Sequence, residues 1–288
     1  MRACTSCPAS PMRCPPPSAC SRPGKHMSLH GHILPAFIVL LAWFGSTGVV
    51  AWLANRGKAT FARSLSWAGF AAGICLCVIV WAAHGHDAAG PQLIDAYISF
   101  GAALVIWGWL ELTFLTGIVA GPRRTASDPH ARGWRRFADA AATLIHHELA
   151  IAVVMVMLVS LTWNSANPTG AVIFSLLFAL RLSAKLNLFV GVPNMSDEIM
   201  PGHLEYLKTY FGPRRLHGAL AFSLVALAAL SLWLGARALA SPDDSFAAVS
   251  ATLVFTLAAL GALEHLFLAL PFRDGALWRW ALPDARKG

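Results

Sequence analysis

Carboxylates and imidazoles occur within three apolar segments of this sequence, where a membrane-spanning helix would meet hydrocarbon. Glu111 lies within one segment, His147 and Glu148 lie in the next, and Glu264 and His265 lie near the end of the last. A charged side chain costs about 3 kcal/mol at the centre of a bilayer, so such residues usually face a bundle interior and mark function. We therefore expect a polar cluster inside a helix bundle to be the working part of the protein.

Metal ligation is one chemistry that these side chains could support. Carboxylate and imidazole groups bind iron, manganese or zinc, and helix bundles build di-metal sites from Glu and His on facing helices. The usual Glu-x-x-His spacing is absent, and adjacent residues of a helix point about 100° apart. The sequence leaves open a metal ion, a haem, or a pigment whose magnesium is bound by His147 or His265. The candidate metal ligands are Glu111, His147, Glu148, Glu264 and His265.

Two cations in a neighbouring apolar segment offer an alternative to ligand binding. Arg181 and Lys185 are spaced as i and i+4, so they lie on one face of a helix. They could pair with the carboxylates and hold the bundle together, which is the usual fate of such residues. A proton relay is a further alternative. The complete predicted intramembrane cluster is Glu111, His147, Glu148, Arg181, Lys185, Asn187, Glu264 and His265.

The overall composition is that of a membrane protein. Of 288 residues, 57% are hydrophobic and only 12% are charged, whereas about 25% of the residues in a soluble domain are charged. The net charge of +8 follows loops rather than one helix face, which argues against a nucleic-acid partner. The sequence contains no phosphate-binding loop, dinucleotide-binding motif or nucleophile elbow. We therefore expect an all-α polytopic bundle with membrane lipids around it.

Apolar segments of about 20 residues, the length that crosses a bilayer as a helix, alternate with turn-rich or charged sequence. Seven spans are predicted, at 33–54, 64–84, 94–120, 137–163, 171–192, 217–240 and 246–271. Lys and Arg gather in the loops after the first, third and fifth spans and in the C-terminal tail, and the other connecting loops hold none. The positive-inside rule then predicts an outside N-terminus and a cytoplasmic C-terminus.

The N-terminal residues differ from the rest of the chain. Residues 1–28 are rich in Pro, Ser and Cys, lack the apolar core of a signal peptide, and place four cations on the side predicted to be outside. Cys4 and Cys7 form a CxxC without a second pair, which argues against a zinc or redox site. We predict a disordered extension, with Met27 as an alternative start, followed by a seven-helix domain over 29–288.

The ionisable groups share a predicted depth. Counting helix rise places Glu111 about ten residues before the cytoplasmic end of its span, and His147 about ten residues after the start of its own. Arg181 and Lys185 precede the end of the fifth span by about eleven and seven residues, and Glu264 precedes the end of the last by about seven. We expect one polar layer in the cytoplasmic half of the membrane.

The loop at 193–216 has the clearest pattern among the connections. Pro201–Tyr210 is expected to form a short amphipathic helix with Leu204, Leu207 and Phe211 on one side, lying on the membrane or on a partner. A plain connecting helix is the alternative.

Long and unusual motifs occur along most of the chain. They are WFGSTG (43–48), WGWLELTFLTG (107–117), GPRRTASDPHARGWRRFADAAATLIHHELAI (121–151), LTWNSANPTG (161–170), RLSAKLNLFVGVPN (181–194), MPGHLEYLKTYF (200–211) and LEHLFLALP (263–271). At these motifs the chain resembles the PuhE family, the putative photosynthetic complex assembly protein 2 of purple phototrophic bacteria. The resemblance covers about 29–282, nearly the whole chain outside the extension.

The resemblance implies a multi-pass protein of the bacterial cytoplasmic or intracytoplasmic membrane. Members are encoded near the reaction-centre H subunit and are linked to assembly of reaction-centre and light-harvesting complexes, or to bacteriochlorophyll supply. The implied partners are subunits of these complexes or enzymes of pigment synthesis. An alternative is a membrane-embedded, metal-dependent oxidoreductase that acts on a hydrophobic pigment precursor.

Overall fold

The computed structural model describes residues 29–85, 90–195, 200–270 and 280, and within them every regular element is helical. The predicted extension lies outside the described residues. The α-helices are α1 (Leu34–Ala54), α2 (Phe61–His84), α3 (Leu93–Leu115), α4 (Gly133–Ala141), α5 (Ile145–Leu161), α6 (Thr169–Val190), α7 (Gly218–Ala240) and α8 (Phe246–Ala269). A π-helical turn, η2 (Leu29–Ile33), runs into α1, and two 3₁₀ segments are η3 (Lys58–Thr60) and η4 (Gly202–Tyr210).

Six of these helices, α1, α2, α3, α6, α7 and α8, are long and apolar enough to cross a membrane. The pair α4 and α5 also passes when taken together, with a bend of 67° between its two parts, which gives up to seven spans. The prediction of an all-α polytopic bundle is therefore confirmed for the described residues. The helix lengths fit a bilayer core of about 30 Å at 1.5 Å of rise per residue.

The predicted continuous helix over 137–163 is wrong, because the chain breaks between α4 and α5. The backbone N–H of Arg123 donates to the carbonyl of Ala142 (3.1 Å), and the N–H of His147 donates to the carbonyl of Ala120 (3.1 Å). A stretch of the preceding loop thus replaces hydrogen bonds that a continuous helix would make internally. Gly121 permits this approach, since a Cβ there would lie 2.1 Å from the Ala142 carbonyl oxygen.

The third helix also ends earlier than predicted, at Leu115 rather than near residue 120. Gly117 has a φ of +74°, which favours glycine, and the N–H groups of Ile118 and Val119 both donate to the carbonyl of Thr113. This closes the helix in the manner of a left-handed C-terminal cap. The five residues after Leu115 are therefore free to reach the α4–α5 break.

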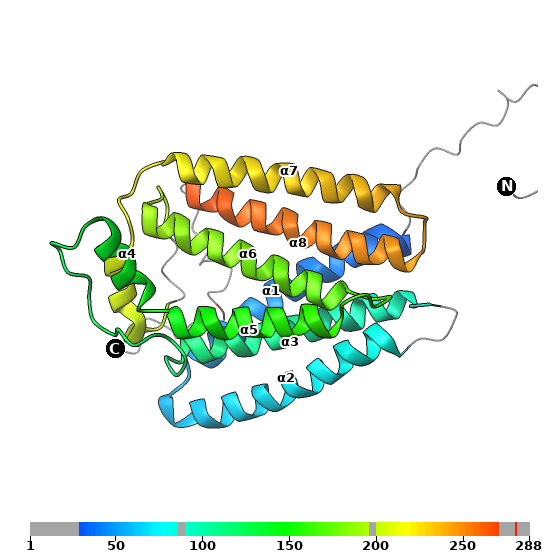
Figure 1. The fold of residues 1–288 in the computed structure, drawn as a ribbon, viewed down its shortest axis with the longest axis horizontal. Coiled ribbons are helices and arrows are strands. Elements are labelled where there is room, and N and C mark those ends of the chain that lie inside the picture. The colour runs from blue at the N-terminus through cyan, green and yellow to red at the C-terminus, as the bar shows by residue number, and fades with distance from the viewer. Residues whose placement is uncertain (1–28, 86–89, 196–199, 271–279, 281–288) are drawn as a thin grey trace, which may run out of the picture.

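Helix α3 lies at the centre of the bundle (Figure 1) and packs against α1, α2, α5, α6 and α8. In the most apolar stretch of α3, 61% of the residues are buried inside the bundle. The corresponding share for α7 is 11%, because α7 packs mainly on α8 at the outside. The apolar core joins Phe100, Trp107, Phe174, Leu253 and Leu257. Because the outer helices leave large apolar side chains exposed, the bundle has the surface expected of a protein surrounded by lipid.

The loops rich in Lys and Arg emerge at one end of the bundle (Figure 1). We call it the basic end; it comprises residues 55–60, 116–144, 191–195 and 200–217. Helices α5 and α6 join at the opposite end, as do α7 and α8. Successive spans therefore alternate in direction, as the charge pattern of the loops requires.

The predicted short helix after α6 forms as the 3₁₀ segment η4. Its Leu204 and Leu207 are buried against Phe114 and Ala120. Phe211 follows the segment and is only partly buried, whereas Tyr210 is buried. The apolar side of η4 therefore covers the basic end of the chain's own bundle.

Candidate functional site

Two ion pairs join three helices near the basic end. Arg181 of α6 contacts Glu111 of α3 through two nitrogen–oxygen approaches of 3.3 and 3.4 Å. Lys185, one turn further along α6, lies 2.5 Å from a carboxylate oxygen of Glu148 in the first turn of α5. The i and i+4 spacing thus directs both cations of α6 toward carboxylates, one on each neighbouring helix.

Burial differs between the two pairs. The side chain of Glu111 is 8% exposed, whereas that of Arg181 is 47% exposed. Both partners of the Lys185–Glu148 pair are largely enclosed, at 20% and 13%. The ammonium group of Lys185 also lies 5.5 Å from the centre of the Phe114 ring, within the range of a cation–π contact. The second pair is therefore the more strongly desolvated.

His147, the residue before Glu148, is completely buried. Its ring stacks on Phe114 with centroids 4.7 Å apart, and its own backbone N–H donates to the carbonyl of Ala120. Within the described part of the chain, neither ring nitrogen has a hydrogen-bond partner. A buried imidazole in this state carries an unrecovered desolvation cost.

Glu264 and His265 of α8 enter different contacts. The indole N–H of Trp43 in α1 donates to Glu264 (2.7 Å). His265 contacts the carbonyl of Gly261 through Nδ1 (2.8 Å) and the hydroxyl of Ser183 through Nε2 (3.0 Å). Because a carbonyl only accepts, Nδ1 of His265 is the donor to Gly261.

Asn187 of α6 joins the same side of the bundle. Its amide donates to the carbonyl of Ser183 and to the hydroxyl of Ser223 in α7, both at 2.9 Å. With His265, these side chains link α6, α7 and α8 by hydrogen bonds, a common form of interhelical contact in membranes. This second cluster is separate in its bonding from the two ion pairs.

Of the eight predicted cluster residues, four form the two ion pairs, and three, Asn187, Glu264 and His265, form hydrogen bonds. The side chain of His147 does neither within the described residues. Among the described residues, no three His, Cys, Asp or Glu side chains are arranged to hold a metal ion. The predicted ligand set of Glu111, His147, Glu148, Glu264 and His265 accordingly does not assemble as one coordination sphere. Arg181 and Lys185 occupy the positions beside the carboxylates that a metal would need.

The depth prediction also needs correction. Since α3 ends at Leu115 and α5 begins at Ile145, Glu111 and Glu148 lie within about one helical turn of their helix ends, not ten residues inside. The ionisable groups do share one end of the bundle. They lie beneath the cover that η4 and the loop after α3 provide.

A cavity of about 400 Å³ opens among α1, α3, α6 and α8 and extends beneath η4. Its wall is mostly apolar and includes Val39, Leu104, Leu177 and Leu257. The polar part of the wall consists of Ser46, Thr47, Glu111, Thr143, Arg181, Lys185, Glu264 and His265, with Trp43 and Tyr210. Its size falls within the range of small-molecule sites, about 300–1,000 Å³.

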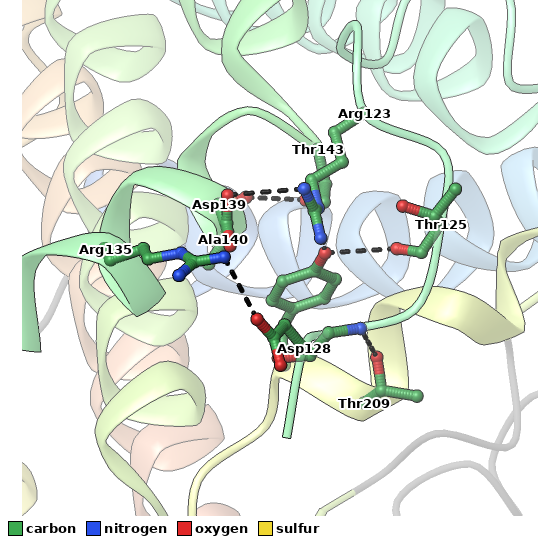
Figure 2. Close-up of polar contacts among 10 residues, drawn as sticks. Arg123, Thr125, Asp128, Arg135, Asp139, Ala140, Thr143 and Thr209 are labelled. Atoms are coloured by element: carbon green, nitrogen blue, oxygen red, sulfur yellow. Dashed lines mark hydrogen bonds and ion pairs between the residues drawn. The ribbon is translucent and has the colours of Figure 1, made fainter. Parts of the chain in front are cut away.

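A polar network holds the cover of the cavity in place (Figure 2). Arg123 donates to the hydroxyl of Tyr210 (2.6 Å) and pairs with Asp139 of α4 (3.3 Å), and the Tyr210 hydroxyl donates to the carbonyl of Thr125 (3.1 Å). Arg136 of α4 donates to the backbone carbonyl of Tyr210 (2.8 Å). The loop after α3, helix α4 and η4 thus form one folded unit, which we call the cap (residues 116–144 and 200–211).

The environment of the cap is partly apolar. Burial raises the pKa of Tyr206, a residue of η4 outside the spans. Its hydroxyl has no hydrogen-bond partner within the described residues. The underside of the cap therefore continues the low-polarity surroundings of the cavity.

Sequence reasoning did not identify several residues of this region. In the sequence, Trp43, Phe114 and Tyr210 look like ordinary apolar or aromatic residues. Nothing in the sequence identifies Ser183 as the hydrogen-bond partner of a histidine. Their roles follow from helix rotation and from the fold of the cap. The motifs that resemble the PuhE family include all four positions, but as a pattern without assigned roles.

Comparison with known proteins places the chain in a family. A family model described as a protein of unknown function (DUF3623) matches residues 29–288. The chain belongs to this family. The DUF3623 match, with the relative below, confirms the resemblance to the PuhE family.

One relative from Rhodobacter capsulatus is 34% identical over 256 residues, which cover 87% of this DUF3623 chain and 91% of the relative. It is described as an uncharacterized 30.4 kDa protein in the puhA 5' region. No solved structure matches. Because the match covers nearly all of the relative, we expect the relative to share this arrangement of helices.

Proposed function

We propose that this protein is an assembly factor for the photosynthetic reaction-centre and light-harvesting complex in the bacterial inner or intracytoplasmic membrane. The observation that carries the proposal is the relative from the puhA 5' region, together with the PuhE resemblance. Bacterial genes that lie together commonly serve one process. The bundle supports the proposal because it provides a membrane-embedded cavity and a folded cap through which a client could be engaged.

In this proposal the basic end faces the cytoplasm, as the positive-inside rule indicates. The cap would then be available to cytoplasmic segments of client subunits or to enzymes of pigment synthesis. The two ion pairs act as structural supports: they fix the rotation of α3, α5 and α6, and so fix the wall of the cavity. Buried pairs of this kind are best attested as determinants of arrangement.

Deletion of the relative's gene in Rhodobacter capsulatus tests the proposal, with this chain supplied from a plasmid. We expect the deletion to lower the absorbance of the reaction-centre and light-harvesting complexes while pigment-synthesis enzymes remain present. Expression of this chain should restore the absorbance. Complexes that accumulate at the normal rate and to the normal level in the deletion strain would refute the proposal.

A matched variant separates loss of function from loss of the protein. Tyr210→Phe weakens the cap, whereas Tyr97→Phe removes a distant hydroxyl whose nearest acceptor lies 3.5 Å away. With equal amounts of both variants in the membrane, the first should restore less absorbance than the second. Equal restoration would show that the cap is dispensable for the function.

A further inference from the structure

The cavity has more hydrogen-bond donors than its own residues use. Arg181 has five N–H donors. Within the described residues, its contacts to Glu111 use two of them, and its half-exposed side chain lies in the cavity wall. Lys185 has three donors, and one contacts Glu148. The indole N–H of Trp43, also in this wall, is already used, because it donates to Glu264. An occupant would therefore be recognised through hydrogen-bond acceptors.

The charge of the wall argues against an anionic occupant. Two cations, Arg181 and Lys185, lie beside three carboxylates: Glu111 and Glu264 in the wall, and Glu148 paired with Lys185. Each cation already has a carboxylate within ion-pair distance. An additional carboxylate or phosphate would meet like charges in a poorly solvated site, which is strongly unfavourable.

The apolar part of the wall specifies the rest of the occupant. Side chains from α1, α3, α6 and α8 enclose the cavity toward the bundle centre, with Val39, Leu104 and Leu257 among them. Such a wall accepts hydrocarbon and offers nothing to a strongly hydrated molecule. Val39, Leu104 and Leu257 each lie more than ten residues from the end of their helix at the basic end, whereas Lys185 lies five residues from the end of α6.

We propose that this cavity binds an uncharged, lipid-soluble molecule that presents one or more carbonyl oxygens to Arg181 and Lys185. The carbonyl accepts hydrogen bonds from the unused donors, and the hydrocarbon part extends between α1, α3 and α8. Quinones and ester lipids both have this chemistry. The proposal concerns ligand class and stands independently of the role in complex assembly.

Two glycines on α3 provide a blocking variant and its control. Gly108 is in the cavity wall, and a Cβ there would lie 3.5 Å from Val50, an ordinary contact. Gly101 lies two turns earlier on the same helix, outside the cavity wall, with open space around its Cβ position. Gly108→Leu should fill part of the cavity, while Gly101→Leu adds the same side chain elsewhere. Ala184→Leu, from the α6 side of the wall, supplies a second block if Gly108→Leu fails to fold.

The experiment measures binding of three probes to the full-length protein in detergent by equilibrium dialysis at pH 8. The probes are a decyl-substituted benzoquinone, dioctanoylglycerol and decanoate. We expect at least one uncharged probe to bind about tenfold more tightly than decanoate, and Gly108→Leu to weaken that binding about tenfold with Gly101→Leu unchanged. The quinone and ester arms identify which source of carbonyl the site prefers.

Tighter binding of decanoate would overturn the charge argument. Failure of both uncharged probes to bind, or equal binding by the Gly108→Leu and Gly101→Leu variants, would overturn the site itself. Neither failure bears on the deletion experiment above, since that experiment reads complex assembly and this one reads ligand binding.

Discussion

The Lys185–Glu148 pair should couple α5 to α6 by an amount that can be measured. At 2.5 Å, the attraction of two unit charges in a medium with an effective dielectric constant of about 20 is roughly 6–7 kcal/mol. Desolvation of the two ions offsets much of this gain, so the pair itself has a small net value. Removing one partner is different, because the other charge remains buried alone.

We expect Lys185→Met and Glu148→Leu each to lower the free energy of unfolding by about 3 kcal/mol. This value lies at the low end of the usual range for a buried pair that loses one partner. The double variant should be within about 1 kcal/mol of wild type, since two apolar residues of similar volume replace the pair. Because the two single losses sum to about 6 kcal/mol and the double variant loses at most about 1 kcal/mol, a coupling energy of about 5 kcal/mol or more follows.

The assay is unfolding of the full chain in mixed micelles by SDS titration, followed by tryptophan fluorescence. The control cycle uses Arg135 and Asp128, whose side chains are 73% and 29% exposed at a separation of 3.1 Å. An exposed pair of this kind should couple by less than about 1 kcal/mol. If the Lys185–Glu148 cycle gives no more coupling than the control, both groups reach water independently and the account of the polar layer is refuted.

Further predictions concern His147, the cap and the tight backbone contacts. His147→Phe should raise the free energy of unfolding by about 1 kcal/mol, since it keeps the stack on Phe114 and removes two unsatisfied nitrogens. A loss of stability in the same SDS titration would show that the imidazole is hydrogen-bonded. Tyr210→Phe should speed trypsin cleavage of the cap at Arg123 and Arg124, because it removes two hydrogen bonds of about 1 kcal/mol each. If the Tyr210→Phe variant is cleaved no faster than the Tyr97→Phe variant, the hydrogen bonds of Tyr210 do not hold the cap in place. Gly212→Ala, whose Cβ would lie 2.3 Å from the Val190 carbonyl oxygen, should cost about 1–3 kcal/mol in SDS titration. Gly218→Ala, with open space, is its control, and equal losses would argue against the close approach.

The sequence predicts the helices well because lipid permits few alternatives. Every backbone group must be satisfied within the span, so an apolar segment of about 20 residues becomes a helix almost by necessity. Alternation of basic loops with loops that lack Lys and Arg likewise predicts which connections share an end. These are properties of single segments, which the sequence displays directly.

The errors lie where contacts between distant segments decide the structure. The α4–α5 break depends on the approach of Gly121 to Ala142, and nothing within 137–163 itself signals it. The early end of α3 depends on Gly117, a weak signal inside an apolar run. Because of both differences, Glu111 and Glu148 lie closer to the ends of their helices, at the basic end, than the sequence predicts.

The pairing within the cluster was open for a similar reason. Helical spacing shows that Arg181 and Lys185 share a face, but the rotation of α6 against α3 and α5 selects their partners. That rotation follows from packing around Phe114 and Phe174 rather than from any local pattern. Packing between α1 and α8 likewise selects the indole N–H of Trp43 as a hydrogen-bond donor to Glu264.

The central claim is that ionisable side chains from separate spans meet in pairs inside the bundle, at the wall of one cavity. An electron cryo-microscopy map of the full chain in lipid nanodiscs tests it most directly. The account predicts Arg181 within 4 Å of Glu111 and Lys185 within 4 Å of Glu148, on the cavity side of α6. A map in which these side chains point separately into lipid or water would contradict it.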